Sequence, residues 1–478
     1  MVGNKAQIHL KHNLETWRRT KIITTVGRSD DNYENIESLV TAGVDGFKLN
    51  VSRSGNELVA DQVKWIKSAA ADAGKQVAII LDLSGPRLTI GDFDGIINIE
   101  RGQSIRLEYN ADYGETGHVP TRYDLSDKVK RGERILLFNG RLHAVVTSVK
   151  GKVVYIEAVN SSILLPNKSI HLPDTDLAGD IITPKDRQDL LLGSMLDIDY
   201  VTLNCIQSAD DIKNFKKLLR GMNFRTHIIA KIETRAALND LESILSETDV
   251  VEISADDLIR YHVAEEMTLI QRQIIGLGRQ HMVPTIIDAQ LLMSMGGEKH
   301  ATTIELSEAA NAVLLGSDAL TLGEAVAAGQ YHTESVKTLQ RVIKHAQDII
   351  QIGAAGCTGK LSIQSAITEA IVGLALSLEA KAIVAETKTG ATAKNIAAKR
   401  ETIRLIAVTN NAKTASQLAI VFAVEPYYRP TNKLSVTSTT DWLKDNHVLN
   451  RGDMVVVASG KYPGVVGTTD TIKVRLLE

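Results

Sequence analysis

The chain has 478 residues, and its 54 basic and 57 acidic side chains give a formal net charge of -3. That balance argues against a dedicated nucleic-acid binder, and no stretch approaches the length of an apolar membrane span. The only cysteines, Cys205 and Cys357, exclude a disulfide framework and fit a reducing compartment, so we expect a cytoplasmic protein. The length allows about three domains.

After a polar extension over residues 1–18, short apolar runs alternate with stretches of helical spacing. The pattern occupies residues 19–87 and 181–341. A strand followed by a helix, repeated eight times, predicts a (β/α)8 TIM barrel of the α/β class. The runs that we expect to form its strands are Lys21–Thr25, Gly46–Leu49, Val77–Leu81, Tyr200–Leu203, His227–Ile232, Val250–Ile253, Val283–Ile287 and Ala312–Leu315.

Residues 88–180 interrupt the barrel pattern with a segment too long for one crossover helix. The segment alternates in short pieces such as Ser104–Tyr109 and Val153–Val159, and turn signals such as Asn139-Gly140 separate them. We therefore expect a small β-barrel inserted at the rim. An insertion at that end of the barrel can act as a lid over the site.

A third pattern fills residues 342–478 and predicts a separate C-terminal α/β domain. Its expected strands are Ala382–Glu386, Leu405–Thr409, Met454–Ala458 and Thr471–Leu476. The residues that follow the first strand and begin a helix include Thr387, Lys388, Thr389, Gly390 and Thr392. Hydroxyl groups, a lysine and a glycine at a helix start are typical of a phosphate-binding loop for an effector. An ordinary capped helix start is the alternative.

Charged residues follow the apolar runs, where a barrel of this kind has its active site. Lys231 and Glu233 are two residues apart, so on a strand they point to the same face. The pair indicates either a metal-binding carboxylate beside a catalytic cation or a salt bridge that closes a strand end. Other polar residues at the expected strand ends are Thr24, Thr25, Lys48, Asn50, Ser52, Asp82, Asn204, Ser254, Asp256, Asp257, Asp288 and Asp318. Several carboxylates with two lysines are typical of a divalent-metal and phosphate site.

Arranged in this way, the chain resembles the pyruvate kinase family from Arg18 to Val474. The stretch Ile229-Ala-Lys-Ile-Glu233 is nearly identical to that family's catalytic strand, and Leu81-Asp-Leu-Ser-Gly-Pro86 and Thr389-Gly-Ala-Thr-Ala393 also match. The resemblance implies a glycolytic kinase that depends on Mg²⁺ or Mn²⁺ and moves a phosphoryl group between phosphoenolpyruvate and ADP, giving pyruvate and ATP. It also implies a homotetramer.

The resemblance assigns roles to matching positions. Glu233 and Asp257 match the metal ligands, and Lys48 and Lys231 match catalytic positions, of which Lys231 faces the transferring phosphoryl group and the enolate oxygen. Lys168 matches a lid lysine that reaches the nucleotide. The other positions that match the substrate and nucleotide site are Asn50, Ser52, Arg53, Asp82, Arg87, Asp256 and Ala289. In that family a basic residue at the position of Arg87 goes with potassium independence, so we expect no K⁺ requirement.

Several substrate-site residues depart from the family. Lys48 replaces an arginine of the family, and this replacement keeps the positive charge but loses the bidentate phosphate contact. Asp256 replaces a glycine that lies beside the substrate carboxylate in the family. The remaining replacements are Arg53, Leu83, Thr89, Phe138, Asn139, Gln207, Ala255, Ala289 and Gly323. Three functions therefore stay open: the pyruvate kinase reaction, the same metal centre acting on another enol, keto or hydroxy acid, and a non-catalytic sensor.

Overall fold

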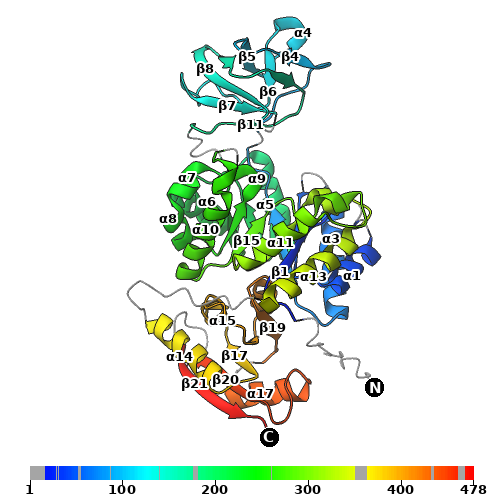
Figure 1. Cartoon of the computed structure of the whole chain (residues 1–478), viewed down its shortest axis with the longest axis vertical. Coiled ribbons are helices and arrows are strands. Elements are labelled where there is room, and N and C mark those ends of the chain that lie inside the picture. The colour runs from blue at the N-terminus through cyan, green and yellow to red at the C-terminus, as the bar shows by residue number, and fades with distance from the viewer. Residues whose placement is uncertain are drawn as a thin grey trace.

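The computed structural model describes residues 17–27, 30, 32–51, 55–86, 88–138, 140–175, 181–259, 261–349, 363–431, 435–460 and 469–478. Three bodies follow one another along the long axis (Figure 1). The β-rich domain between residues 88 and 175, which we call the lid, lies at the top, a barrel with its helices in the middle and an α/β domain at the bottom. Among the helices in these ranges, none has the length and apolar composition of a membrane span.

The middle body is a closed barrel of parallel strands, which confirms the predicted (β/α)8 fold. Around the barrel the order is β1-β16-β15-β14-β13-β12-β3-β2. The strands are β1 (Lys21–Thr25), β2 (Gly46–Leu49), β3 (Ala78–Asp82), β12 (Tyr200–Leu203), β13 (His227–Ile232), β14 (Val250–Ser254), β15 (Thr285–Asp288) and β16 (Ala319–Leu322).

The helices of the barrel pack apolar stripes against these strands. In α3, for example, Val59, Val63, Ile66 and Ala70 are buried and recur at three- and four-residue spacing. The helices are α1 (Tyr33–Ala42), α3 (Asn56–Asp72), α5 (Pro184–Leu196), α6 (Ala209–Gly221), α7 (Arg235–Asn239), α8 (Leu241–Glu247), α9 (Ala255–Leu258), α10 (Met267–His281), α11 (Thr303–Leu314), α12 (Glu324–Ala327) and α13 (His332–Ile349).

The prediction of the eighth strand at Ala312–Leu315 was wrong. These residues end helix α11, which begins with a capping box between Thr302 and Glu305. Gly316, at a φ of 82°, follows the helix, and the strand comes only at β16. A short buried apolar run does not distinguish the last turn of a helix from a strand.

Two residues that we expected at the carboxyl ends of the strands, Asp318 and Thr24, do not lie in the site there. Asp318 precedes β16 at the amino end of the barrel, where its buried carboxylate pairs with Arg400 of the C-terminal domain. Thr24 lies in β1, and its Oγ1 is 2.6 Å from Nε2 of His332 on α13. Both residues therefore contribute to packing between elements rather than to the site.

The lid contains a six-stranded sheet with the order β11-β7-β8-β9-β5-β6 and a two-stranded sheet, β10-β4. Isolated bridges join Ile90 to Thr121 on β6 and Thr89 to Ser169 beside β11, so residues 89–90 connect the two edges of the larger sheet. The elements are β4 (Ile97–Ile99), β5 (Ser104–Tyr109), α4 (Tyr113–Thr116), β6 (Val119–Thr121), β7 (Arg134–Leu137), β8 (Leu142–Lys150), β9 (Val153–Ala158), β10 (Ser162–Leu164) and β11 (Ile170–His171).

The C-terminal domain has a sheet with the order β19-β18-β17-β20-β21, parallel except for the edge strand β21. Two apolar clusters cover its two faces. The elements are α14 (Ile363–Ser377), β17 (Ala382–Glu386), α15 (Ala391–Ala397), β18 (Leu405–Thr409), α16 (Ala412–Leu418), β19 (Val424–Tyr428), α17 (Val436–Asp445), β20 (Met454–Gly460) and β21 (Thr469–Leu476).

The C-terminal domain closes the amino end of the barrel. Ile420 belongs to the buried cluster inside the barrel, and the hydroxyl of Tyr200 donates a hydrogen bond to the carbonyl of Gln417 at 2.7 Å. Because described side chains pack across this end, the lumen opens toward the opposite, lid side of the barrel.

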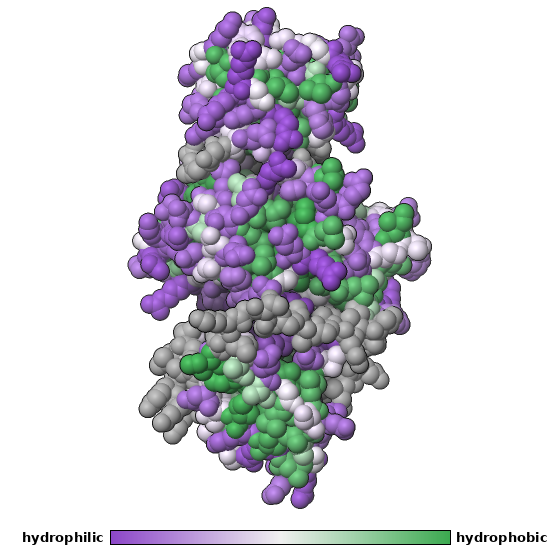
Figure 2. All heavy atoms as spheres, turned by 60° about the vertical axis from the view of Figure 1, so that its left-hand side comes forward, coloured by the Kyte–Doolittle hydropathy of each residue, from purple (hydrophilic) through white to green (hydrophobic). Residues whose placement is uncertain are grey.

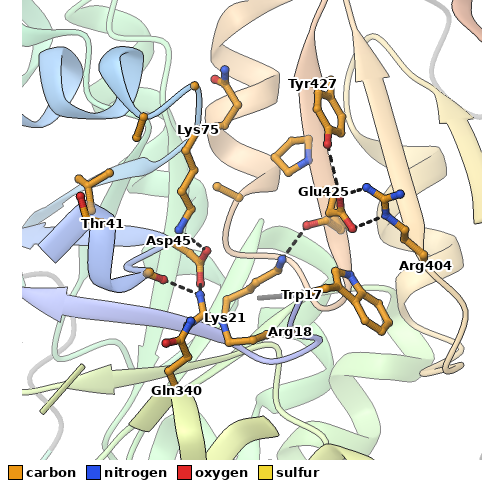
Figure 3. Close-up of a pocket in the computed structure, with 18 residues that line it drawn as sticks. Trp17, Arg18, Lys21, Thr41, Asp45, Lys75, Gln340, Arg404, Glu425 and Tyr427 are labelled. Atoms are coloured by element: carbon orange, nitrogen blue, oxygen red, sulfur yellow. Dashed lines mark hydrogen bonds and ion pairs between the residues drawn. The ribbon is translucent and has the colours of Figure 1, made fainter. Parts of the chain in front are cut away.

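A cluster of charges lies where the barrel meets the C-terminal domain (Figure 3). Asp45 lies 2.7 Å from Arg18 and 2.9 Å from Lys75, and Lys21 donates to the carbonyl of Val424 at 2.7 Å. Burial would raise the pKa of Asp45, but Arg18, Lys75 and Lys21 together lower it to about 2. The carboxylate therefore balances three buried cations at this junction.

Replacing Asp45 by Asn should destabilise the protein at neutral pH. Three cations then lack their countercharge, and breaking a buried ion pair costs about 3 kcal/mol. A carboxylate with a lowered folded-state pKa stabilises above its unfolded pKa of about 4, and that contribution is lost as the pH falls toward 2. Urea denaturation should therefore show a difference between wild type and variant that shrinks from pH 7 to pH 3. An equal difference at both pH values contradicts the electrostatic explanation.

Candidate active site

The barrel lumen is apolar in its middle. Every strand except β2 contributes to one buried cluster, which includes Ile23, Ile80, Tyr200, Ile229, Val250, Ile286 and Ala319. On β2, a Cβ atom added to Gly46 would meet Ile420 and Ile23, so Gly46 faces the same cluster. Side chains alternate across a strand, and the residue two positions further along each strand points into the same lumen.

Those next inward positions are all polar. They are Thr25, Lys48, Asp82, Thr202, Lys231, Glu252, Asp288 and Thr321, and we call them the polar layer. Barrel interiors are ordinarily filled by bulky branched apolar side chains. Two lysines and three carboxyl groups above an apolar floor therefore indicate a functional site at the carboxyl end of the strands.

Within the polar layer, Lys48 reaches across the lumen to two carboxyl groups. Its Nζ lies 2.8 Å from Glu252 Oε2 on β14 and 3.1 Å from Asp288 Oδ2 on β15. Burial opposes the charged form of Lys48, but Asp288 and Glu252 outweigh it and raise the pKa of Lys48 above its usual value. Lys48 is therefore a cation whose charge is already matched inside the barrel.

Lys231 joins the polar layer to two carboxylates at the rim. Its Nζ lies 3.4 Å from Glu233 Oε2 and 3.6 Å from Asp257 Oδ2. The other oxygen of Glu233 accepts a hydrogen bond from the backbone N–H of Cys205. Asp257, in the first turn of α9, accepts a hydrogen bond from Ser254 Oγ at 2.6 Å. The structure thus brings together the predicted lysine and the two predicted metal ligands.

The charges of these groups depend on one another. Burial opposes the ammonium form of Lys231, but Glu233, Asp257 and Asp288 exceed that effect and raise the pKa of Lys231 well above its usual value. Burial also raises the pKa of Glu233, and the Lys231 ammonium offsets part of that rise. Lys231 is therefore charged at neutral pH.

The carboxylates of Glu233 and Asp257 are the kind of donor that Mg²⁺ and Mn²⁺ bind. Both lie against the same ammonium group, so they border one small volume at the rim. Within the described residues, no group of three or more His, Cys, Asp or Glu side chains is arranged to hold a metal ion. Two carboxylates leave most of an octahedral shell to substrate oxygens and water, and so they fit a metal that the substrate helps to bind.

Other predicted residues lie at or just beyond the carboxyl ends of barrel strands. Asn50 lies two residues beyond Lys48, and its buried Oδ1 has no hydrogen-bond partner among the described residues. Asp82 ends β3 in the polar layer, Asp256 precedes Asp257 in α9, and Ala289 is buried directly after β15.

The remaining predicted residues of the substrate site are less informative. Lys168 lies in the lid, where its Nζ is 5.8 Å from the ring centre of Phe138. Ser52, Arg53 and Arg87 lie outside the described residues.

Two hydroxyl groups of the predicted effector loop, those of Thr387 and Thr392, are engaged within the domain. Thr387 Oγ1 accepts a hydrogen bond from the N–H of Gly390 at 2.9 Å, and Thr392 Oγ1 lies 2.7 Å from Thr469 Oγ1. The carbonyl of Lys388 accepts from Thr414 Oγ1. Helix α15 begins after Gly390 without a side-chain cap. The role of Thr387, Lys388, Thr389, Gly390 and Thr392 in binding an effector phosphate stays a prediction.

A cavity of about 680 Å³ opens between the lid and the barrel rim. Glu233 and Asp257 line it from the barrel, and His171 and Asp174 line it from the lid. Cavities of roughly 300–1,000 Å³ are the size that holds small ligands. The paired carboxylates therefore face a covered space large enough for a phosphorylated small molecule.

Comparison with known proteins agrees with the fold. Residues 17–336 match the family model "Pyruvate kinase, barrel domain", and residues 365–475 match "Pyruvate kinase, alpha/beta domain". The chain belongs to the pyruvate kinase family. It is therefore an enzyme of the phosphotransferase class.

Similar proteins span nearly the whole chain. Pyruvate kinase of Corynebacterium glutamicum is 32% identical over 469 residues, which cover 96% of this chain and 98% of that protein. Pyruvate kinase 2 of Synechocystis is 30% identical over 470 residues, covering 96% of this chain and 80% of that protein. The crystal structure of a pyruvate kinase from Cryptosporidium parvum has the same fold, with a TM-score of 0.87, 24% identity and 96% coverage of both chains.

Glu252 is a site residue that sequence reasoning missed. It lies inside the run Val250–Ile253, which reads as one buried strand. The sequence does contain a signal for Glu252. This carboxyl group lies two residues after Val250, at a position that faces the lumen, in a run that is otherwise apolar. The partner that explains this position, Lys48, is far away in the sequence and becomes visible only once the barrel closes.

Replacing Lys48 by Met should destabilise the protein more at high pH than at low pH. Glu252 and Asp288 then lie buried without their cation, and their folded-state pKa values rise. The contribution of a carboxyl group with a raised folded-state pKa is fully present below its unfolded pKa and is lost as the pH rises through the folded-state pKa. We expect a loss of about 3 kcal/mol at pH 8 and a smaller loss at pH 5.5, measured by urea denaturation.

Lys64→Met is the matched control, because the Lys64 side chain is 72% exposed and pairs only at the surface with Asp61. It should change the stability by less than about 0.5 kcal/mol at either pH. A pH-independent effect of Lys48→Met would show that the lysine contributes packing and not charge.

Proposed function

We propose that this enzyme transfers a phosphoryl group between phosphoenolpyruvate and ADP, giving pyruvate and ATP, as a cytoplasmic reaction of glycolysis. The observation that carries the proposal is the Lys231 ammonium, within 3.6 Å of both Glu233 and Asp257 beside a lid-covered cavity. The names of the similar proteins support the same reaction.

Lys231 supplies the fixed positive charge that this chemistry needs. A phosphoryl group in transfer spreads negative charge over its oxygens, and preorganised cations stabilise that charge. The carboxylates around Lys231 keep it protonated, so no proton has to be taken up when the charge develops. The same ammonium can stabilise the enolate oxygen that remains after transfer.

Glu233 and Asp257 would hold the Mg²⁺ or Mn²⁺ ion. An ion bound there supplies positive charge to the phosphoryl and substrate oxygens. With their charge shared by the ion, the two carboxylates attract Lys231 less strongly, and its ammonium can turn toward the substrate. Asn50, Ser52, Arg53, Asp82, Lys168, Asp256 and Ala289 remain our proposed contacts to substrate or nucleotide.

We also propose that the reaction needs no K⁺. Arg87 supports this proposal through the sequence resemblance alone. A second fixed cation, Lys48, lies in the polar layer.

The charge of the site favours a second candidate function. Among the described residues, the polar layer and rim hold five carboxyl groups, Asp82, Glu233, Glu252, Asp257 and Asp288, against two lysines. Lys48 is already paired with two of these groups and offers little attraction to a phosphate. The alternative is therefore the same metal centre acting on another enol, keto or hydroxy acid.

A coupled assay with phosphoenolpyruvate, ADP and Mg²⁺ tests the first candidate. We expect a turnover of roughly 1–100 per second without added K⁺. Glu233→Gln should lower it at least ~100-fold, because a charged metal donor becomes neutral. Glu369→Gln is the matched control: its side chain is 55% exposed and lies in the C-terminal domain. Absence of turnover in wild type that still binds Mn²⁺ would favour the second candidate.

We propose further that the protein is a homotetramer. Hydrophobic side chains gather on one face of the C-terminal domain (Figure 2). On this domain Ile363, Val474 and Leu476 are exposed, and β21 is an edge strand that a second copy could pair. On the barrel, Leu269 and Ile304 are 66% and 80% exposed. A closed tetramer with two-fold axes uses two such self-complementary surfaces.

Light scattering after size exclusion should give a mass of four chains of 52.0 kDa each. Leu476→Glu places a charge on the β21 surface, and Ile304→Glu places one on the barrel surface. Each variant alone should give dimers, because the other surface stays intact, and both together should give monomers. A monomeric wild type overturns the proposal.

A further inference from the structure

Asp288 and Glu252 form a carboxyl pair that the phosphoryl-transfer chemistry does not use. Both contact the same Lys48 ammonium, Asp288 at 3.1 Å and Glu252 at 2.8 Å, so the two carboxyl groups lie side by side. Two carboxylates that share a site repel one another, and a proton on one of them removes this repulsion. The pair is therefore suited to hold one proton in the polar layer.

The charges around the pair support this protonation state. Lys48 faces it from β2 and Lys231 faces it from β13, while Asp82 approaches from β3. With all three carboxyl groups ionised, the polar layer would carry one more negative than positive charge. A proton on the pair makes the layer neutral above its apolar floor, where an unbalanced charge is costly.

The two carboxyl groups differ in their access to substrate. Glu252 is fully buried, whereas 25% of the Asp288 side chain is exposed at the barrel mouth. Burial raises the pKa of Glu252 to about 7, while Lys48 and Lys231 hold the pKa of Asp288 below its usual value against the effect of burial. Glu252 is thus the member of the pair suited to keep the proton, and Asp288 is the member that is exposed at the barrel mouth.

We propose that Asp288, sharing one proton with Glu252, is the acid and base that moves a proton to and from C3 of the substrate enol. This inference rests on the proposed function, because it assumes an enolate held at Lys231. Lys231 lies on β13, between β12 on one side and β14 on the other. Asp288 lies on β15, beyond β14, and would therefore approach the substrate from the β14 side of Lys231.

The proton step balances without a further reactant. The electron pair of the C2=C3 double bond forms a bond from C3 to the carboxyl proton of Asp288, and the C2 oxygen becomes a carbonyl. The shared proton passes from Glu252 to Asp288 before this transfer, which leaves both groups as carboxylates, and water later returns one proton to the pair. In reverse, the Asp288 carboxylate removes a proton from the methyl group of a 2-oxo acid.

The reverse step can be measured apart from phosphoryl transfer. Wild-type enzyme with pyruvate, Mg²⁺ and inorganic phosphate in D₂O should exchange the methyl protons of pyruvate, followed by proton NMR. Asp288→Asn should slow this exchange at least ~100-fold, the range of general acid–base catalysis. Asp288→Glu keeps an acid at this position and should restore at least a tenth of the wild-type rate.

Asp199→Asn is the matched control. Asp199 is also a buried carboxyl group of the same barrel, with a pKa raised by burial to about 7, but it lies at the amino end and accepts the N–H of Ile79. This variant should exchange protons within threefold of wild type. Melting curves of all variants exclude loss of folded protein as the cause.

Glu252 acts through Asp288 and is a positioning residue. Exchange in the wild type should rise with pH through about 7, as the pair loses its shared proton. In Glu252→Gln, Asp288 titrates alone beside two ammonium groups, so the midpoint should move down by at least one pH unit. A purely structural role of Glu252 would change the rate and leave the midpoint in place.

The outcomes separate this inference from the proposed function. Proton exchange by a wild type that does not transfer the phosphoryl group of phosphoenolpyruvate leaves the inference standing and rejects the proposed function. Phosphoryl transfer with proton exchange that is unchanged in Asp288→Asn overturns the inference alone. Absence of exchange in the wild type also overturns it.

Discussion

The ammonium group of Lys231, held between the carboxylates of Glu233 and Asp257, is the interaction on which the rest of the site depends. A lysine at this depth is stable as a cation only because carboxylates surround it, and the carboxylates are tolerated there only because of the lysine. The closed barrel makes this mutual dependence possible. Its strands point side chains into one lumen, and Ile420 of the C-terminal domain packs into the amino end.

The same constraint explains why the polar layer is arranged in pairs. Lys48 is matched by Glu252 and Asp288 within the lumen, and Lys231 by the rim carboxylates. Each of the two lysines therefore contacts two carboxyl groups, which offsets part of the negative charge at the mouth of the barrel. Lys48 therefore attracts an incoming phosphate less strongly than a lysine without partners would. This weaker attraction is the reason to consider a second class of substrate.

The parts of the molecule that sequence predicts well are those with local signals. Strand β13 is bounded as expected, and the Lys231–Glu233 spacing alone places both groups on one face. The strand expected at Ala312–Leu315 fails because a buried helix end and a buried strand have the same apolar composition. Glu252 escapes notice for a different reason. Its position makes sense only through Lys48, which lies across the barrel and distant in the sequence.

The central claim is that Glu233 and Asp257 hold a divalent metal beside Lys231. The most direct measurement is a crystal structure with Mn²⁺ and oxalate, using anomalous scattering to locate the ion. The account predicts one strong peak about 2.0–2.2 Å from a carboxylate oxygen of Glu233 and of Asp257, with oxalate completing the shell next to the Lys231 ammonium. A peak between Glu252 and Asp288 instead, or no peak in the barrel at a saturating Mn²⁺ concentration, would contradict it.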